Sequence, residues 1–148
     1  MVNVFIFTTS IEHTTHRKAA RLLQSNGANV LYSGFYRNNF PEGKLEGIKV
    51  VSLGNVSHGN YFKRLITGIK TIKKIRTLGK DSDIVYCFTL DGLLISYLSF
   101  LFSKKKFVFQ VQDIRPIFFG TSLISKLAKV LEKYALRHVS LLVVSSPN

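Results

Sequence analysis

The sequence predicts an α/β fold of the doubly wound, Rossmann-like kind, with a mainly parallel sheet of about six strands and helices on both faces. Short apolar runs alternate with longer amphipathic runs along most of the chain. The first run is apolar almost throughout, as in a strand covered on both faces. The amphipathic runs are long enough for right-handed crossovers between parallel strands. We therefore expect residues 1–148 to form a single domain.

The first half of the chain supplies three of these strands. Residues 2–8 form the apolar first strand, and residues 15–26 form a helix that ends before a glycine. Residues 28–33 are the second strand and residues 48–53 the third. The link between them, residues 34–47, contains proline, glycine and asparagine without helical periodicity, so we expect a loop.

The second half continues the alternation. Apolar residues recur at three- and four-residue steps over 61–78, which predicts one long helix that ends at Gly79. A further helix, residues 122–137, has Leu123, Leu127, Leu131 and Tyr134 on one face. The remaining expected elements are strands at 83–88, 106–112 and 140–145 and a helix at 90–102.

Composition excludes several classes of site. The single Cys87 excludes an intrachain disulfide and a thiolate metal site, and the four histidines are scattered, so we expect no metal. The loop after the first strand, residues 9–14, has no glycine, which argues against NAD or FAD binding, and there is no Walker A sequence. The longest apolar stretch, 90–102, is shorter than the about 20 residues that a spanning helix needs. A reducing, cytoplasmic location fits best.

The charge is strongly positive, with 21 Lys and Arg against 8 Asp and Glu. Such an excess indicates an anionic partner: nucleic acid, a membrane surface or a phosphorylated ligand. Basic side chains gather on two amphipathic helices, a pattern that suits an anionic membrane surface, although a solvated outer face is the alternative. The residues expected at the membrane are Lys63, Arg64, Lys70, Lys73, Lys74, Lys126, Lys129 and Lys133.

Polar residues follow three strands at the edge where α/β domains bind ligands. His13, His16 and Arg17 stand where the first helix begins and could bind an anion there, or the histidines could be solvated beside a capping threonine. Asp91 follows the fourth strand and could be only a helix cap. Asp113 and Arg115 follow the fifth strand, where they could meet an acceptor hydroxyl or only pair with each other.

Several stretches together resemble the N-terminal, acceptor-side domain of GT-B glycosyltransferases of the retaining family called family 4 or group 1. Residues 11–30 are similar to that family's first loop and helix, in which an acid precedes an Arg-x-x-Ala helix. Residues 83–91 and 107–116 resemble its fourth and fifth strands with their loops. Residues 131–135 and 141–147 resemble the last helix and the Val-Val-Ser-Ser-Pro strand that precede the interdomain linker.

The resemblance implies a transferase in which this domain holds the acceptor. The C-terminal domain that binds the nucleotide-sugar donor is absent from residues 1–148, so we expect inactivity without that domain or a partner subunit. The donor is a co-substrate; no other cofactor and no metal are implied. The expected acceptor is lipid-linked or a polysaccharide at the inner face of the cell membrane, where the protein would be peripheral.

The resemblance also assigns roles to residues. Asp113 is the expected catalytic residue. Gln112 stands where many members of the family have His, and glutamine can hydrogen-bond a hydroxyl but cannot act as an acid or base. The expected substrate-binding residues are Glu12, His13, Arg17, Asp91, Gln112 and Arg115.

Two other functions are compatible with the sequence. A basic, non-enzymatic α/β module could bind nucleic acid or another polyanion through phosphates, but no recognised reader motif is present, so nucleic acid is the disfavoured partner. A stand-alone enzyme of flavodoxin-like topology is disfavoured because the first strand lacks a phosphate-binding loop.

Overall fold

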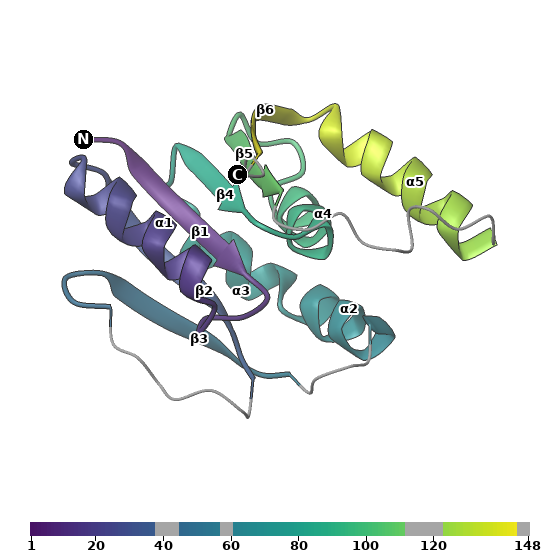
Figure 1. The fold of residues 1–148 in the computed structure, drawn as a ribbon, viewed down its shortest axis with the longest axis horizontal. Helices are drawn as coiled ribbons and strands as arrows, with labels where there is room; N and C mark the ends of the chain where they lie inside the picture. The colour runs from purple at the N-terminus through teal and green to yellow at the C-terminus, as the bar shows by residue number, and fades with distance from the viewer. Residues whose placement is uncertain (38–44, 57–60, 112–122, 145–148) are drawn as a thin grey trace.

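The protein forms one parallel sheet of six strands in the order β3-β2-β1-β4-β5-β6, which confirms the predicted fold class (Figure 1). The computed structural model describes residues 1–37, 45–56, 61–111 and 123–144. The strands are β1 (Asn3–Thr8), β2 (Asn29–Tyr36), β3 (Lys49–Asn55), β4 (Ile84–Cys87), β5 (Lys106–Val111) and β6 (Val139–Val144). The helices are α1 (Thr14–Ser25), α2 (Tyr61–Lys70), α3 (Ile72–Leu78), α4 (Leu90–Ser99) and α5 (Leu123–Leu136).

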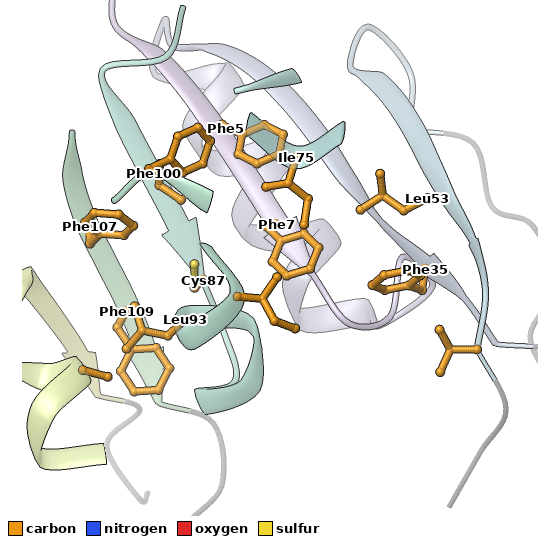
Figure 2. Packing of buried hydrophobic residues seen from close by; sticks show 14 residues of the cluster. Phe5, Phe7, Phe35, Leu53, Ile75, Cys87, Leu93, Phe100, Phe107 and Phe109 are labelled. Atoms are coloured by element: carbon orange, nitrogen blue, oxygen red, sulfur yellow. The ribbon is translucent and has the colours of Figure 1, made fainter. Parts of the chain in front are cut away.

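Helices cover both faces of the sheet, as predicted. On one face, α1 packs through Ala20 against Val4 and Ile6 of β1. On the other face, Ile75 of α3 and Leu93 of α4 pack against the remaining side chains of the central strands. Figure 2 shows how the aromatic residues of this second cluster lie across the strands; they include Phe5, Phe7, Phe35, Phe107 and Phe109.

Two predicted helices have different limits in the structure. The single helix expected over 61–78 is divided into α2 and α3 at Thr71, whose backbone N–H and hydroxyl both donate to the carbonyl of Gly68, at 3.0 and 2.8 Å. Side-chain bonds of this kind compete with the helical ladder, and sequence periodicity does not register them. The helix expected over 90–102 ends at Ser99, and Phe102 then adopts a left-handed φ of 67°.

The apolar face expected on the last helix is only partly covered. Ala135 is buried, and Tyr134 meets the ring of Tyr97 edge-on with centroids 5.9 Å apart. Leu131 and Tyr134 nevertheless remain 40% and 48% exposed. The side chains of Leu123 and Leu127 lie outside the described part of the structure.

The strand order places a topological switch point between β1 and β4. These two strands are direct neighbours, with Phe7 opposite Cys87, yet the chain leaves β1 toward β2 and leaves β4 toward β5. In open parallel sheets, ligands bind outside the carboxyl ends of strands at such a point. The loops that follow β1 and β4 are therefore the first place to look for a functional site.

Candidate functional site

The loops after β1 and β4 meet at the carboxyl edge of the sheet. The hydroxyl oxygens of Thr9 and Thr89 lie 3.5 Å apart, although the residues are 80 positions apart in the chain. Thr9 and Asp91 also line a small pocket together with Phe35, Val56 and Ile95. Two threonine hydroxyls and one carboxylate thus gather at this edge of the sheet, above an apolar core.

The loop after β1 is held by a buried network around Thr8. The Thr8 hydroxyl donates to the carbonyl of Ser10 at 2.9 Å and accepts the Ser10 backbone N–H at 3.1 Å. The same hydroxyl lies 2.6 Å from Nδ1 of His16, which is 1% exposed. Nδ1 of His16 also lies 3.4 Å from the carbonyl oxygen of Ser10, so the ring faces both partners of the turn. This network fixes the loop without the glycines that a dinucleotide fold has there.

Glu12 lies in the same loop and is 8% exposed. Its Oε2 accepts the Ser10 hydroxyl at 3.1 Å, and its Oε1 accepts the backbone N–H of Arg37 at 2.9 Å. The carboxylate therefore ties the β1 loop to the chain that follows β2. Both oxygens still have lone pairs for a ligand, since a carboxylate accepts about four hydrogen bonds.

Three rings form a stack beside this network. The His16 ring lies on Phe88 with centroids 4.0 Å apart, and the His13 ring lies on His16 with centroids 4.2 Å apart. Phe88 and His16 are buried, whereas His13 is exposed. The stack holds His13 at the start of α1, where the sequence predicts a substrate-binding residue.

Arg17 lies one helical turn after His13 and is half-buried. The guanidinium group of Arg17 interacts electrostatically with Tyr32. The phenol of Tyr32 donates a hydrogen bond to the carbonyl of Ile11 at 3.1 Å. Burial raises the pKa of Tyr32 far above its usual range, so this phenol stays protonated. Arg17 therefore places a positive charge near His13, and the uncharged phenol of Tyr32 holds the loop through its hydrogen bond to Ile11.

The loop after β4 prepares the start of α4. The Thr89 hydroxyl accepts the N–H of Gly92 at 3.3 Å and so caps the helix. Asp91, in the first turn, is 6% exposed and lies at the positive end of the helix. The cap predicted as an alternative role for Asp91 thus belongs to Thr89, and Asp91 remains a candidate for ligand binding.

Cys87, at the end of β4, is not a candidate nucleophile. It is fully buried, and burial raises its pKa to about 12. Its thiol contacts the hydroxyl of Ser96 at 3.3 Å. Cys87 is a packed core residue at neutral pH.

The other predicted site residues are distributed as follows. Gln112, Asp113 and Arg115 lie outside the described residues, so their roles stay predictions. The backbone of α2 includes Lys63 and Arg64, whose side chains the structure does not describe. The remaining basic residues expected at a membrane are all exposed: Lys70, Lys73, Lys74, Lys126, Lys129 and Lys133.

Among the described residues, no group of three or more His, Cys, Asp or Glu could hold a metal ion. Within the same residues, no helix is long and apolar enough to span a bilayer.

Sequence reasoning did not identify the residues whose hydrogen bonds and ring contacts hold the site loops in place. Thr8, Thr9 and Phe88 were expected only as parts of a strand or a loop. His16 was expected beside an anion at the start of the first helix, and the structure places it in the buried network with Thr8. One signal was available: an apolar strand that ends in the polar run Thr8-Thr9-Ser10 must place hydroxyls at the carboxyl edge. The stack of His13, His16 and Phe88 had no such signal, because Phe88 is 72 positions from His16 in the chain.

Comparison with known proteins gives relatives over nearly the whole chain, although no family model matches. The succinoglycan biosynthesis protein ExoL of Rhizobium meliloti (strain 1021) is 20% identical over 152 residues, which cover 99% of this chain and 38% of that protein. The sucrose-phosphate synthase of Thermosynechococcus elongatus has a TM-score of 0.75 at 11% identity and covers 99% of this chain. The lipopolysaccharide outer core galactosyltransferase WaaB has a TM-score of 0.53 at 13% identity over 94% of this chain.

The chain spans only about two-fifths of the length of these proteins: 38% of ExoL, 43% of the synthase and 44% of WaaB. It therefore corresponds to one domain of larger molecules. The predicted resemblance is confirmed at the level of the fold: residues 1–148 have the fold of part of a GT-B protein, one Rossmann-like domain.

Proposed function

We propose that this chain is the acceptor-binding half of a retaining glycosyltransferase. One observation carries the proposal: the loops after β1 and β4 bring Thr9, Thr89 and Asp91 together at the switch point of a GT-B-type domain. Two similarities support it, because one solved neighbour is a galactosyltransferase and the curated relative takes part in the biosynthesis of a named glycan, succinoglycan. Fold alone does not fix function, so the site residues must carry the assignment.

The site has the chemistry that an acceptor saccharide requires. Sugar hydroxyls donate to carboxylates and exchange hydrogen bonds with threonine hydroxyls, and Asp91, Thr9 and Thr89 are groups of these kinds. His13 and Arg17 stand at the start of α1, after the neighbouring loop, and extend the polar surface. Glu12 and the Thr8 network hold this surface rigid, which reduces the entropic cost of binding.

In the proposed reaction, the bond between the anomeric carbon and the leaving phosphate of a nucleotide sugar breaks. The acceptor oxygen forms its bond on the same face, and its proton passes to an oxygen of the leaving phosphate. The two reacting atoms must come within about 3 Å in a water-poor cleft. The donor would be bound mainly by a second domain or a separate subunit, with no further cofactor. Asp113 would orient the acceptor hydroxyl, with Gln112 and Arg115 beside it.

The proposed setting is the inner face of the cell membrane, with a lipid-linked or polysaccharide acceptor. Exposed lysines on α2, α3 and α5 support this setting, since each cation near an anionic leaflet contributes on the order of 1 kcal/mol. On α5 they accompany Val130, which is 64% exposed, so this helix offers both charge and apolar surface.

Saturation-transfer NMR on the chain tests the proposal. Lactose and cellotetraose serve as neutral acceptor probes, and UDP-glucose serves as the donor probe. We expect the saccharides to bind, and we expect Asp91→Asn to weaken them about tenfold or more, because a hydrogen bond to a charged group is lost. Asp81→Asn is the matched control, since Asp81 is exposed and lies at the opposite end of β4. Tight binding of UDP-glucose with no saccharide binding would refute an acceptor-side role.

A further inference from the structure

A second feature of the surface lies at the opposite, amino edge of the sheet. A hollow of about 640 Å³ opens between the end of α3, the turn after α4 and the beginnings of β4 and β5. Its lining contains four lysines, namely Lys80, Lys104, Lys105 and Lys106. Ser82 and Ser103 add hydroxyls, and Val2 adds apolar surface. The hollow is separate from the site at the carboxyl edge and has no part in the proposed reaction.

One of the four lysines, Lys105, is held in place by hydrogen bonds. Lys105 is half-buried, and its ammonium group donates to the carbonyl of Lys80 at 2.8 Å, to the carbonyl of Ser82 and to the Ser82 hydroxyl at 3.3 Å. Burial lowers the pKa of Lys105, with the charges of Asp81 and Asp83 acting against that shift. The ammonium group of Lys105 is thus held beside the hollow by three oxygen atoms of the protein.

The acids near the hollow compensate only part of its charge. Asp81 and Asp83 are the two carboxylates that act on Lys105, against four lysines. Asp83 lines the hollow too, and its Oδ2 accepts the backbone N–H of Asn3 at 2.8 Å. The side chains of Lys80, Lys104 and Lys106 are exposed around the rim. A phosphate group that enters the hollow would therefore meet a net positive field.

The turn beside the hollow carries an exposed aromatic ring in an unfavourable backbone conformation. Phe102 is 98% exposed and has a φ of 67°, a region that non-glycine residues adopt at a cost. Lysines near the ends of α3 and α4 can be explained by the helix dipole, but the dipole gives no reason for an exposed phenylalanine there. An aromatic residue next to exposed cations is the combination that membrane interfaces favour.

We propose that the amino edge of the sheet docks on an anionic phospholipid bilayer, with Phe102 in the interfacial layer and a lipid phosphate in the lysine-lined hollow. The lysines match an anionic phosphate, and the exposed ring of Phe102 matches the apolar layer of a bilayer. A soluble phosphate would contact the lysines but not Phe102, so we favour lipid. The surface continues from the basic side of α3, which ends at Leu78 just before Lys80. It does not depend on the function of the carboxyl edge.

The absence of tryptophan from the chain permits a direct test. The Phe102→Trp variant is mixed with vesicles of phosphatidylcholine alone and with vesicles that also contain phosphatidylglycerol. We expect its emission to move to shorter wavelength only with the anionic vesicles. Leu22→Trp is the matched control, because Leu22 is 65% exposed on the outer side of α1 and should remain in water.

Two further variants separate docking from folding. Phe102→Gly should raise the thermal midpoint, because glycine tolerates the left-handed conformation, and yet weaken vesicle binding about tenfold. Lys104→Gln combined with Lys106→Gln should weaken binding to anionic vesicles, whereas Lys18→Gln with Arg21→Gln, both exposed on α1, should have a smaller effect. An unshifted emission of the Phe102→Trp variant with anionic vesicles would overturn the proposal. Saturable binding of inorganic pyrophosphate without vesicle binding would overturn it too and assign the hollow to a soluble phosphate.

Discussion

At the scale of single residues, the site depends on the hydroxyl of Thr8, which forms hydrogen bonds both with the imidazole of His16 and with the backbone of Ser10. Thr8 joins Ser10 and His16 through one oxygen atom, and all three residues are at most 4% exposed. Buried polar groups cost free energy when a partner is removed, so this network should be intolerant of substitution.

Thr8→Val should therefore lower the free energy of unfolding by about 1–3 kcal/mol, because His16 and Ser10 both lose a partner without a change of volume. It should also weaken saccharide binding, since the loop that carries Thr9 becomes less ordered. Urea unfolding monitored by circular dichroism gives the first quantity. Thr77→Val is the control, because the hydroxyl of Thr77 bonds the carbonyl of Lys73 on an exposed helical surface, at 3.0 Å. Equal losses in the two variants would contradict a special role for the network.

Cys87 leads to a prediction about alkaline stability. Burial raises its pKa from 9.0 to about 12, so the folded protein holds this proton more tightly than the unfolded chain. The resulting stabilisation is complete below about pH 9 and is lost as the pH rises toward 12. Between about pH 9 and about pH 10, the free energy of unfolding should fall by at most about 1.4 kcal/mol per pH unit from this group. Cys87→Ala should flatten that slope in urea titrations; an unchanged slope would show that Cys87 is not its source.

At the scale of helices and strands, the sequence predicted those elements whose formation depends on the local sequence pattern. The alternation of apolar and amphipathic runs predicted all six strands and their parallel sheet, because burial on both faces leaves that pattern. The division of one predicted helix into α2 and α3 was not predictable in this way. It depends on a hydroxyl of Thr71 and on the packing of Gly68 against α4, which only the folded chain brings together.

The contact between α2 and α4 predicts a reversal of a common rule. Replacing glycine by alanine inside a helix usually stabilises it by about 1 kcal/mol. A Cβ atom at Gly68 would lie 2.2 Å from Cδ1 of Ile95, so Gly68→Ala should instead destabilise the protein by about 1–3 kcal/mol. In the Ile95→Ala background, which is itself destabilised by the loss of a buried side chain, Gly68→Ala should cost much less. A double-mutant cycle by urea unfolding measures the coupling, and additive effects would show that α2 does not pack on α4 as described.

The site was predictable in part for the same reason. His13, Arg17 and Asp91 follow strands in the sequence, so the rule for strand ends located them, whereas Glu12 was indicated by the family resemblance. The packing that supports them was not predictable, because Phe88 and Arg37 reach the site from distant parts of the chain. Asp113 is the predicted residue on which the proposed chemistry depends most, and it stays a prediction.

At the scale of the whole molecule, the two proposed surfaces lie at opposite ends of the strands. A central strand of six residues is about 20 Å long, so a docked domain would hold its acceptor site roughly that far from the bilayer. Such a spacing suits the growing end of an extended saccharide better than a single sugar attached directly to lipid. We therefore expect longer oligosaccharides to bind more tightly than monosaccharides, measured by the same saturation-transfer experiment with cellotetraose against methyl glucoside. Equal affinities would contradict this expectation.

The most direct test of the central claim is a map of backbone amide shifts for the chain titrated with cellotetraose and, separately, with UDP-glucose. An acceptor-side domain should show saccharide-dependent shifts concentrated in residues 9–17 and 89–92, at the carboxyl ends of β1 and β4, and much weaker shifts with UDP-glucose. Saccharide shifts absent from both loops, or strong UDP-glucose shifts there, would contradict the assignment of this domain to the acceptor.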